Sequence, residues 1–188
     1  MRYFGLIGKS LSHSFSQKFF TAKFAADGIE ACYDLLEIDS ISKIDRLIAE
    51  KQLSGFNVTI PYKESIIPYL DDLSDEAREV GAVNCVVIKD ARKVGYNTDV
   101  MGIDATLEWL DTTDVKVLIL GTGGASKALQ HVLRKRSMPY SIVSRDKQRG
   151  DYTYDEVTPD VIVEHGIIVN TTPVGMFPNV DAAPAICY

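Results

Sequence analysis

The most constraining feature of the sequence is a buried strand that runs into a glycine-rich turn and then into a helix. Val115–Leu120 is apolar except for Lys116, which is typical of a buried strand, and the turn Gly121–Ser126 follows it directly. Apolar residues then recur at helical spacing in Leu129–Leu133. A strand, a glycine turn and a helix in this order form the dinucleotide-binding fingerprint. We therefore predict a Rossmann-type nucleotide-binding unit in this half of the chain.

Within that turn, the glycines have separate expected tasks. Gly121 would permit the tight turn, and Gly123 and Gly124 would let backbone amides approach a pyrophosphate at the helix start. Ser126 stands where the fingerprint usually has a third glycine or an alanine.

The end of the next strand bears on the choice between NAD and NADP. Tyr140–Val143 reads as that strand, and Ser144, Arg145 and Asp146 follow it. An acidic residue directly at this point would hold the ribose of NAD, whereas an arginine accommodates the 2′-phosphate of NADP. Because Ser144 and Arg145 come first, the sequence favours NADP, although the carboxylate of Asp146 would repel a phosphate. A third strand, Gly166–Asn170, leads into a further loop at a strand carboxyl end, where α/β proteins bind ligands.

The first half of the chain also alternates strands with helices, which indicates an α/β layer structure. We predict an α/β fold with an N-terminal α/β/α domain that has a mixed sheet, residues 1–100, followed by an incomplete Rossmann-type domain, residues 101–188. The boundary is expected near Thr98–Gly102. The mixed sheet would include a hairpin between Ala82–Ile88 and Lys93–Asn97. The other strands are expected at Tyr3–Ile7, Ala31–Ile38 and Gly55–Ile60. The segment Leu73–Glu76 is expected to be the capped start of a short helix.

The segment Asn57–Lys63 combines an amide, hydroxyls and an ammonium group at the expected end of a strand. Polar and apolar residues alternate in it, so a strand would bury one set and present the other. Pro61 cannot donate to a sheet ladder and should end the strand. The apolar run Ile66–Leu70 has helical spacing, so Lys63 is expected near a helix N-terminus, where the macrodipole would lower its pKa toward proton transfer. The alternative is an ordinary solvated lysine.

Three other positions carry polar groups with two interpretations each. Ser14 and Ser16 begin an expected helix that runs to about Ala26, where they could cap the helix or bind a carboxylate, and one geometry serves both. Asn84 lies in an apolar run, so it is either a structural latch or a ligand contact. Asp99 opens another helix and is either an N-terminal cap or a carboxylate that holds a substrate hydroxyl and pairs with Lys63.

Composition narrows the classes of partner. The formal net charge of −6 argues against nucleic acid and anionic membranes. The three cysteines are odd in number and lack metal-ligand spacing, so we expect no metal site and a reducing cytoplasm. No signal peptide or bilayer-length apolar span is apparent. A monomer or a homodimer in the cytoplasm is expected.

Taken together, these segments resemble shikimate dehydrogenase, the family of NADP-dependent enzymes that reduce 3-dehydroshikimate to shikimate in aromatic amino acid biosynthesis. The matching segments occur in family order and span nearly the whole chain. They are Ser12–Ser16, Asn57–Lys63, Gly81–Asn84, Gly95–Asp99, Gly121–Ala125, Ser144-Arg145 and Asn170–Met176.

The resemblance implies roles for particular residues. On the substrate side, Ser14 and Ser16 would hold the carboxylate, Thr59, Asn84 and Asp99 would bind around the ring, and Lys63 would be the catalytic proton carrier paired with Asp99. On the cofactor side, the resemblance implies a pyrophosphate turn, a clasp for the adenosine end in which Ser144 replaces an asparagine, and a loop beside the nicotinamide. Those cofactor residues are Gly121, Gly123, Gly124, Ala125, Ser144, Arg145, Thr172 and Met176, with Asp75 as a further position near the cofactor.

The chain departs from the family in length. The family continues with the second half of the nucleotide domain and a closing helix that returns to the substrate domain, whereas this chain ends at Tyr188. An open sheet edge with adjoining apolar surface is therefore expected, together with reduced or absent turnover, or rescue by self-association.

Three other readings remain. An NAD-using quinate/shikimate dehydrogenase is the nearest. A non-catalytic shikimate- or nucleotide-binding protein and a scaffold fragment that awaits a partner chain are the others.

Overall fold

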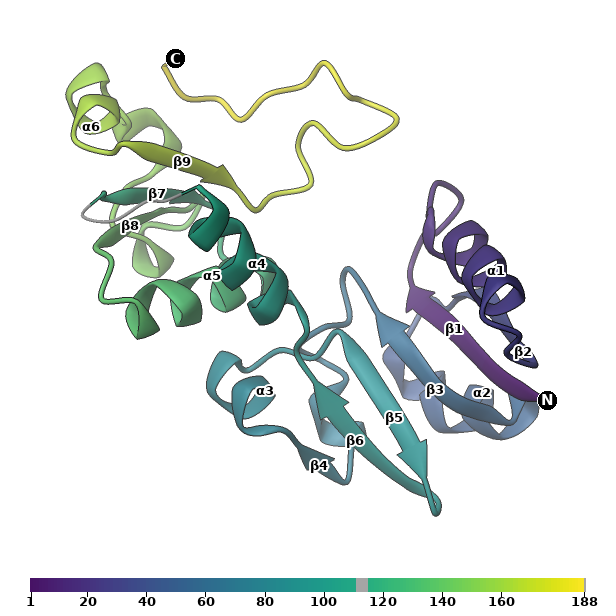
Figure 1. Cartoon of the computed structure of the whole chain (residues 1–188). Coiled ribbons are helices and arrows are strands. Elements are labelled where there is room, and N and C mark those ends of the chain that lie inside the picture. The colour runs from purple at the N-terminus through teal and green to yellow at the C-terminus, as the bar shows by residue number, and fades with distance from the viewer. Residues whose placement is uncertain (111–114, 188) are drawn as a thin grey trace. The chain divides into compact units, whose positions relative to one another are not determined.

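The computed structural model describes residues 1–110 and 115–187, and the chain divides into two compact units, Met1–Thr98 and Asp99–Tyr188. The predicted fold class is confirmed. The first unit is built on a mixed sheet flanked by helices, and the second on a parallel sheet (Figure 1).

The first unit contains a six-stranded sheet in the order β2-β1-β3-β5-β6-β4. Strand β1 pairs parallel with β2 and β3, β5 pairs antiparallel with β3 and β6, and β4 pairs parallel with β6. The sheet is therefore mixed, as the sequence predicts. The strands are β1 (Arg2–Gly8), β2 (Ala31–Glu37), β3 (Leu53–Val58), β4 (Asp72–Leu73), β5 (Cys85–Lys89) and β6 (Arg92–Tyr96).

The expected hairpin is confirmed. Strands β5 and β6 are joined at Asp90 and Ala91, which both have positive φ angles of 50° and 61°. Two consecutive residues in the left-handed region are typical of the two-residue turn whose twist matches that of the flanking strands.

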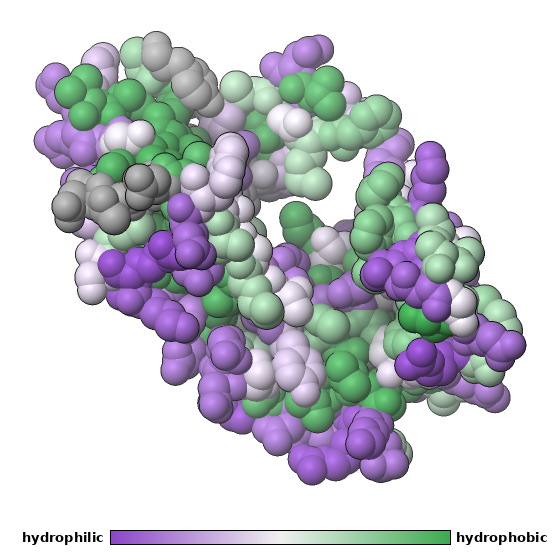
Figure 2. Space-filling view, viewed as in Figure 1, coloured by the Kyte–Doolittle hydropathy of each residue, from purple (hydrophilic) through white to green (hydrophobic). Residues whose placement is uncertain are grey.

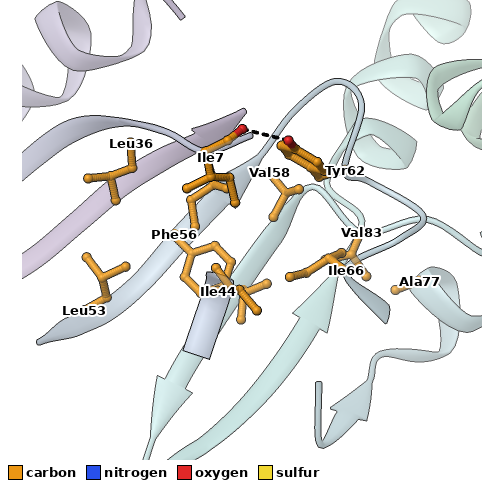
Figure 3. Packing of buried hydrophobic residues seen from close by; sticks show 12 residues of the cluster. Ile7, Leu36, Ile44, Leu53, Phe56, Val58, Tyr62, Ile66, Ala77 and Val83 are labelled. Atoms are coloured by element: carbon orange, nitrogen blue, oxygen red, sulfur yellow. Dashed lines mark hydrogen bonds between the residues drawn. The ribbon is translucent and has the colours of Figure 1, made fainter. Parts of the chain in front are cut away.

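Alternating side chains give the sheet two apolar faces. On one face, Leu6 and Tyr33 are buried with Leu11, and the aromatic rings of helix α1 (Ser16–Ala26) pack against them. On the other face, Ile7 and Phe56 are buried against Ile44 of helix α2 (Ile44–Lys51). Figure 3 shows this second cluster, in which the Tyr62 hydroxyl donates to the carbonyl of Ile38 at 2.7 Å. A period of two along each strand thus produces the α/β/α layers.

The region after Lys63 differs from the prediction. Strand β3 ends at Val58, and Ile60 is 54% exposed rather than buried. No α-helix begins at Lys63. Turns lead from it to a short 3₁₀ helix, η2 (Ile67–Tyr69). Pro68 explains the difference, because it has no N–H to donate and its ring would clash with a preceding helical turn. The expected helix N-terminus at Lys63 is therefore wrong.

Two further short helical elements complete the first unit. Helix α3 (Asp75–Val80) begins as predicted, with the Ser74 hydroxyl accepting from the amide of Ala77 at 3.2 Å. The 3₁₀ helix η1 (Ile41–Lys43) leads directly into α2. Polar and apolar residues are interspersed over the surface seen in Figure 2. Phe15 is 68% exposed.

The second unit begins with helix α4 (Asp99–Trp109) and contains the parallel sheet β8-β7-β9. An isolated parallel bridge joins Val143 to Tyr152 on the outer side of β8. Across the sheet, the segment at Tyr152 is followed by β8, β7 and β9. This matches the strand order 3-2-1-4 of a Rossmann-type sheet. The remaining elements are β7 (Val117–Leu120), α5 (Gly124–Lys135), β8 (Tyr140–Val143), η3 (Lys147–Arg149), η4 (Tyr154–Glu156), α6 (Pro159–Val163) and β9 (Ile167–Asn170).

The core of the second unit lies around β7. Leu118 and Leu120 are buried with Val143 and Val157, and Ile186 from the C-terminal segment packs against them. Strand β7 has a parallel neighbour on each side, whereas β9 ends the sheet and leaves Ile168 37% exposed. Helices α4 and α5 are joined by an ion pair between Arg136 and Asp104 at 2.6 Å.

Residues 1–110 and 115–187 contain neither a membrane-spanning helix nor a cluster of metal-ligating side chains. No helix there is long and apolar enough to cross a bilayer. Nor do three or more histidine, cysteine or acidic side chains there gather closely enough to hold a metal ion.

Candidate active site

The serine-rich loop after β1 and the loop after β3 lie side by side at the carboxyl ends of these parallel strands. The amide of Lys9 donates to the carbonyl of Ile60 at 3.4 Å, and the amide of Thr59 donates to the carbonyl of Ile7 at 2.9 Å. A Cβ atom at Gly8 would lie 2.8 Å from the Thr59 methyl carbon, so only glycine permits this approach. The fold therefore brings Thr59 to the base of the serine loop.

The serine loop is fixed at both ends. The amide of Leu11 donates to the Glu37 carboxylate, and the amide of Ser14 donates to the carbonyl of Leu11 at 2.8 Å. The Ser14 hydroxyl accepts from the amide of Ser16 at 3.2 Å, where α1 begins. Both serines are partly buried. Ser14 thus makes the capping-type contact expected from the sequence, and its hydroxyl keeps a proton to donate.

Lys63 is held through its backbone rather than by a helix. Its carbonyl accepts from the amide of Val83 at 2.7 Å, and the preceding turn is closed by the amide of Tyr62 donating to Thr59 at 2.9 Å. The Lys63 side chain is partly buried. These bonds tie the lysine to the segment that carries Asn84.

Asn84 acts as a structural latch. It precedes β5 rather than lying inside a strand, and its side-chain oxygen accepts from the amide of Thr98 at 2.8 Å. Its side-chain nitrogen donates to the Thr98 hydroxyl at 2.9 Å. The backbone carbonyl of Asn84 accepts from the amide of Val58 at 2.9 Å and from the Asn57 side chain at 3.2 Å. Of the two interpretations left open by the sequence, the latch is observed, and the ligand contact stays a prediction.

The two predicted acidic residues occupy first turns of helices. Asp99 is the first residue of α4 and of the second unit, directly after the latched Thr98. Its pairing with Lys63 stays a prediction, because the two residues belong to different units. Asp75 is exposed in the first turn of α3. Carboxylates at these positions are favoured by the helix dipole.

The glycine turn of the second unit combines a residue of positive φ with open space at the N-terminus of α5. Gly121 has a φ angle of +108°, and a Cβ there would lie 2.9 Å from side-chain atoms of Thr171 and Thr172. A Cβ at Gly123, the N-cap residue of α5, would meet nothing within 4 Å. Open space in front of the N-terminus of a twelve-residue helix fits a dinucleotide phosphate.

The two residues after Gly123 continue into the helix. Gly124 and Ala125 are its first residues and are both partly buried. Ser126, the departure from the fingerprint, is fully buried, and its hydroxyl accepts from the Gln130 side chain at 3.0 Å. The serine is therefore accommodated without an unpaired polar group.

The loop after β8 carries the predicted adenosine clasp. Ser144 is buried, and its hydroxyl accepts from the amide of Asp146 at 3.1 Å. The Asp146 carboxylate in turn caps η3 by accepting from the amide of Gln148 at 3.0 Å. Arg145 is exposed at the tip of this turn.

A second arginine, which the sequence analysis missed, reaches the glycine turn. Arg149 donates from Nη2 to the carbonyl of Thr122 at 3.4 Å. The sequence shows only that a basic residue follows Arg145 closely. The 3₁₀ helix η3 brings the guanidinium of Arg149 to the glycine turn. Lys147, between the two arginines, is instead bound to the Glu156 carboxylate, which holds the pKa of Glu156 below its usual range.

The loop after β9 is braced by Asn170. Its side-chain oxygen accepts from the amide and the hydroxyl of Thr172 at 2.9 and 2.7 Å, and its nitrogen donates to the carbonyl of Val174 at 2.9 Å. Met176 is 58% exposed at the end of this loop. The Thr171 hydroxyl donates to the carbonyl of Leu120 at 2.7 Å and joins the loop to β7, so the loop and the glycine turn lie together.

Known proteins resemble this chain in both its first unit and its second unit. A family profile described as the shikimate dehydrogenase substrate binding domain matches residues 6–86. The NADP(+)-dependent shikimate dehydrogenase of Clostridium beijerinckii is 37% identical over 198 residues, which cover 98% of this chain and 72% of that enzyme.

Solved structures give the same result. Shikimate dehydrogenase 1 from Peptoclostridium difficile superposes with a TM-score of 0.89 at 37% identity, covering 98% of this chain and 72% of that one. Shikimate 5-dehydrogenase from Thermus thermophilus, solved in complex with NADP(H) and shikimate, has a TM-score of 0.84 at 29% identity, covering 98% and 73%. Sequence and structure therefore agree that this chain belongs to the shikimate dehydrogenase family.

Proposed function

We propose that this protein is an NADP-dependent shikimate dehydrogenase that catalyses the reversible reduction of 3-dehydroshikimate to shikimate. The observation that carries the proposal is the gathering of the serine loop, the Thr59–Lys63 turn and Asn84 at one end of the first unit's sheet. A relative with the same fold has been solved in complex with NADP(H) and shikimate.

The substrate is a ring that carries one carboxylate and several hydroxyl groups. Ser14 and Ser16 would donate hydrogen bonds to the carboxylate at the start of α1, where the helix dipole also favours a negative charge. Thr59 and Asn84 offer a hydroxyl and an amide to the ring hydroxyls. Neutral donors and acceptors of this kind select polar groups, because a mismatched ligand leaves them unpaired.

Lys63 has the chemistry for the proton transfer. When bound, NADPH supplies a hydride to the carbonyl carbon of 3-dehydroshikimate. Negative charge then grows on the carbonyl oxygen, and the Lys63 ammonium stabilises that charge and donates a proton to it. In the direction of shikimate oxidation, the neutral amine accepts the same proton. Asp99 is proposed as the carboxylate that pairs with Lys63.

The second unit supplies the cofactor site in this proposal. Backbone amides from Gly123 to Ala125 at the N-terminus of α5 would hold the pyrophosphate. Arg145 would bind the 2′-phosphate of NADP, with Arg149 as a second cation at the glycine turn. Thr172 and Met176 would lie on the nicotinamide side. Asp75 of the first unit is proposed near the cofactor on the strength of the family resemblance alone.

Calorimetry and a spectrophotometric assay test the proposal together. Shikimate and NADP⁺ should each bind the 188-residue chain, and NADPH should form when both are present, at the reduced rate that the sequence analysis expects. NAD⁺ and quinate should give much less product, and Lys63→Ala should retain shikimate binding without product. Binding of shikimate by the wild type without any hydride transfer would instead support a non-catalytic binding protein. Absence of shikimate binding would contradict the proposal entirely.

A further inference from the structure

Glu37 is the last residue of β2, and its carboxylate lies at the end of an otherwise apolar row. It follows Tyr33 and Leu35 at intervals of two, so all three side chains lie on the face of the sheet that α1 covers. Tyr33 and Leu35 pack in the apolar cluster of that face, whereas Glu37 pairs with Gly8 at the end of β1. The strand thus brings an acid to the edge of the sheet where the serine loop, residues 9–15, begins.

The backbone amide of Leu11 takes its acceptor from this acid. Leu11 lies three residues beyond the end of β1, where the chain has left the sheet ladder. Its side chain is buried with Leu6 and Tyr33, so leaving the adjacent amide without an acceptor would be costly. The Glu37 carboxylate accepts from that amide across 26 positions of sequence and makes a charge-assisted bond.

Leu11 in turn contacts both sides of the candidate substrate site. Its carbonyl accepts from the amide of Ser14 at 2.8 Å. A Cβ atom at Gly8 would lie 2.6 Å from a methyl carbon of Leu11 and 2.8 Å from the methyl carbon of Thr59, so these two side chains share the space above the glycine. The position of Leu11 therefore sets the position of Ser14 and limits that of Thr59.

We propose that Glu37 is a positioning residue that holds Leu11, and through Leu11 the serine loop, in the conformation that receives the carboxylate of the substrate. The inference rests on the proposed function, because that function supplies the carboxylate. The negative charge of Glu37 itself opposes the approach of an anion. Its contribution to affinity therefore comes from the place of its oxygen as an acceptor and not from its charge.

The expected effect is a loss of affinity without a comparable loss of catalytic rate. A loop that is ordered before the substrate arrives spares binding the cost of ordering it. One net hydrogen bond at an exposed position is worth roughly three- to tenfold in an equilibrium constant, so Glu37→Ala should weaken shikimate binding by that factor. The kcat of hydride transfer should change much less than KM, because Lys63 is held by its own backbone bond to Val83.

Two conservative variants separate the acceptor from the charge, with calorimetry and shikimate as the readout. Glu37→Gln removes the charge but keeps an oxygen at the same reach, and should bind nearly as well as the wild type. Glu37→Asp keeps the charge but shortens the side chain, and should bind as weakly as Glu37→Ala. Glu30→Ala, an exposed acid just before the opposite end of β2, is the matched control and should leave affinity unchanged. Wild-type affinity in Glu37→Ala, or equal losses in Glu37→Gln and Glu37→Ala, would overturn the proposal.

A double-mutant cycle with Ser14 tests the route of the effect. Because Glu37 acts on the substrate through the serine loop, Glu37→Ala should cost less affinity in a Ser14→Ala background than in the wild type. Full additivity of the two substitutions would contradict this route.

A further measurement requires no ligand and separates this inference from the proposed function. In the free ¹⁵N-labelled chain, the Leu11 amide should exchange slowly with solvent in the wild type and in Glu37→Gln, and faster in Glu37→Ala and Glu37→Asp. If the wild type fails to bind shikimate but this exchange pattern holds, the proposed function is wrong and the anchoring of the loop by Glu37 stands. A Leu11 amide that exchanges equally in the wild type and in Glu37→Ala contradicts the positioning role.

Discussion

The two units prepare their candidate ligand sites in different ways. In the first unit, the relevant groups are side chains that hydrogen-bond to one another or to nearby backbone, such as Ser14 with the Ser16 amide and Asn84 with Thr98. In the second unit, the turn after β7 depends on backbone conformation, with Gly121 at a positive φ angle. The first site is specified by functional groups, and the second by the space and the amides that glycine leaves available.

This difference predicts different responses to substitution. Removal of one polar group in the first unit should weaken shikimate binding or catalysis and leave NADP binding intact. Addition of a single carbon atom in the glycine turn should affect NADP binding or the stability of the second unit and leave shikimate binding intact. The following predictions test that contrast.

The largest effect is expected at Lys63. Lys63→Ala should lower the rate of NADPH formation by about 10²- to 10⁴-fold, because the proton donor and the cation that stabilises the developing charge are both lost. Shikimate affinity measured by calorimetry should change far less. Lys89→Ala, an exposed lysine at the end of β5, is the matched control and should retain full activity. An active Lys63→Ala variant would show that Lys63 is not the catalytic group of the first unit.

Arg145 should decide between NADP and NAD. Arg145→Ala should weaken NADP⁺ binding by about 10- to 100-fold, the range expected for a charge-assisted bond to a phosphate, and should leave NAD⁺ binding unchanged. Arg134→Ala, at the exposed end of α5, controls for the change in net charge. Equal losses for the two cofactors would show that Arg145 does not bind the 2′-phosphate.

The glycine turn offers a matched pair of substitutions. Gly121→Ala should lower the free energy of unfolding by about 1–3 kcal/mol, because the residue has a φ angle of +108° and the new methyl would clash with Thr171 and Thr172. Gly123→Ala should cost much less stability, since its Cβ would meet nothing within 4 Å, but it should still weaken NADP⁺ binding. Urea denaturation and calorimetry separate the two effects. If both variants lose stability equally, the backbone account of this turn is wrong.

A smaller effect is expected at the cap of α3. Ser74→Ala removes the acceptor for the Ala77 amide and should lower the free energy of unfolding of the first unit by about 1 kcal/mol. Ser74→Asp should restore most of that loss, because aspartate is an equally good cap. Neither variant should alter the affinity for shikimate, and a change there would indicate that α3 takes part in the site.

Regular elements were predictable from the sequence wherever the local pattern and the tertiary structure agree. Strand β8, the hairpin of β5 and β6 and the capped start of α3 follow directly from apolar patterning and turn residues. The prediction of a helix after Lys63 was wrong because the apolar spacing of this segment favours a helix, whereas Pro68 within it prevents one. Strand β4 has two residues and depends on its pairing with β6, so no local sequence pattern predicts it.

The candidate site was predictable as a set of residues but not as a set of contacts. The strand ends locate Ser14, Thr59 and Lys63, since carboxyl ends of parallel strands meet at one edge of a sheet. The Asn84 latch on Thr98 could not be foreseen, because it depends on how a segment before β5 meets the end of β6. Glu37 looked like an ordinary strand residue, and only the pairing of β1 with β2 brings it to the serine loop.

The most direct test of the central claim is an NMR titration of the ¹⁵N-labelled chain with shikimate. Amide shifts should concentrate in residues 12–16, 59–63 and 84, and the glycine turn at 121–125 should respond only when NADP⁺ is added. If shikimate moves the amides of the glycine turn and leaves the serine loop and the turn around Lys63 unchanged, the assignment of the substrate to the first unit is wrong.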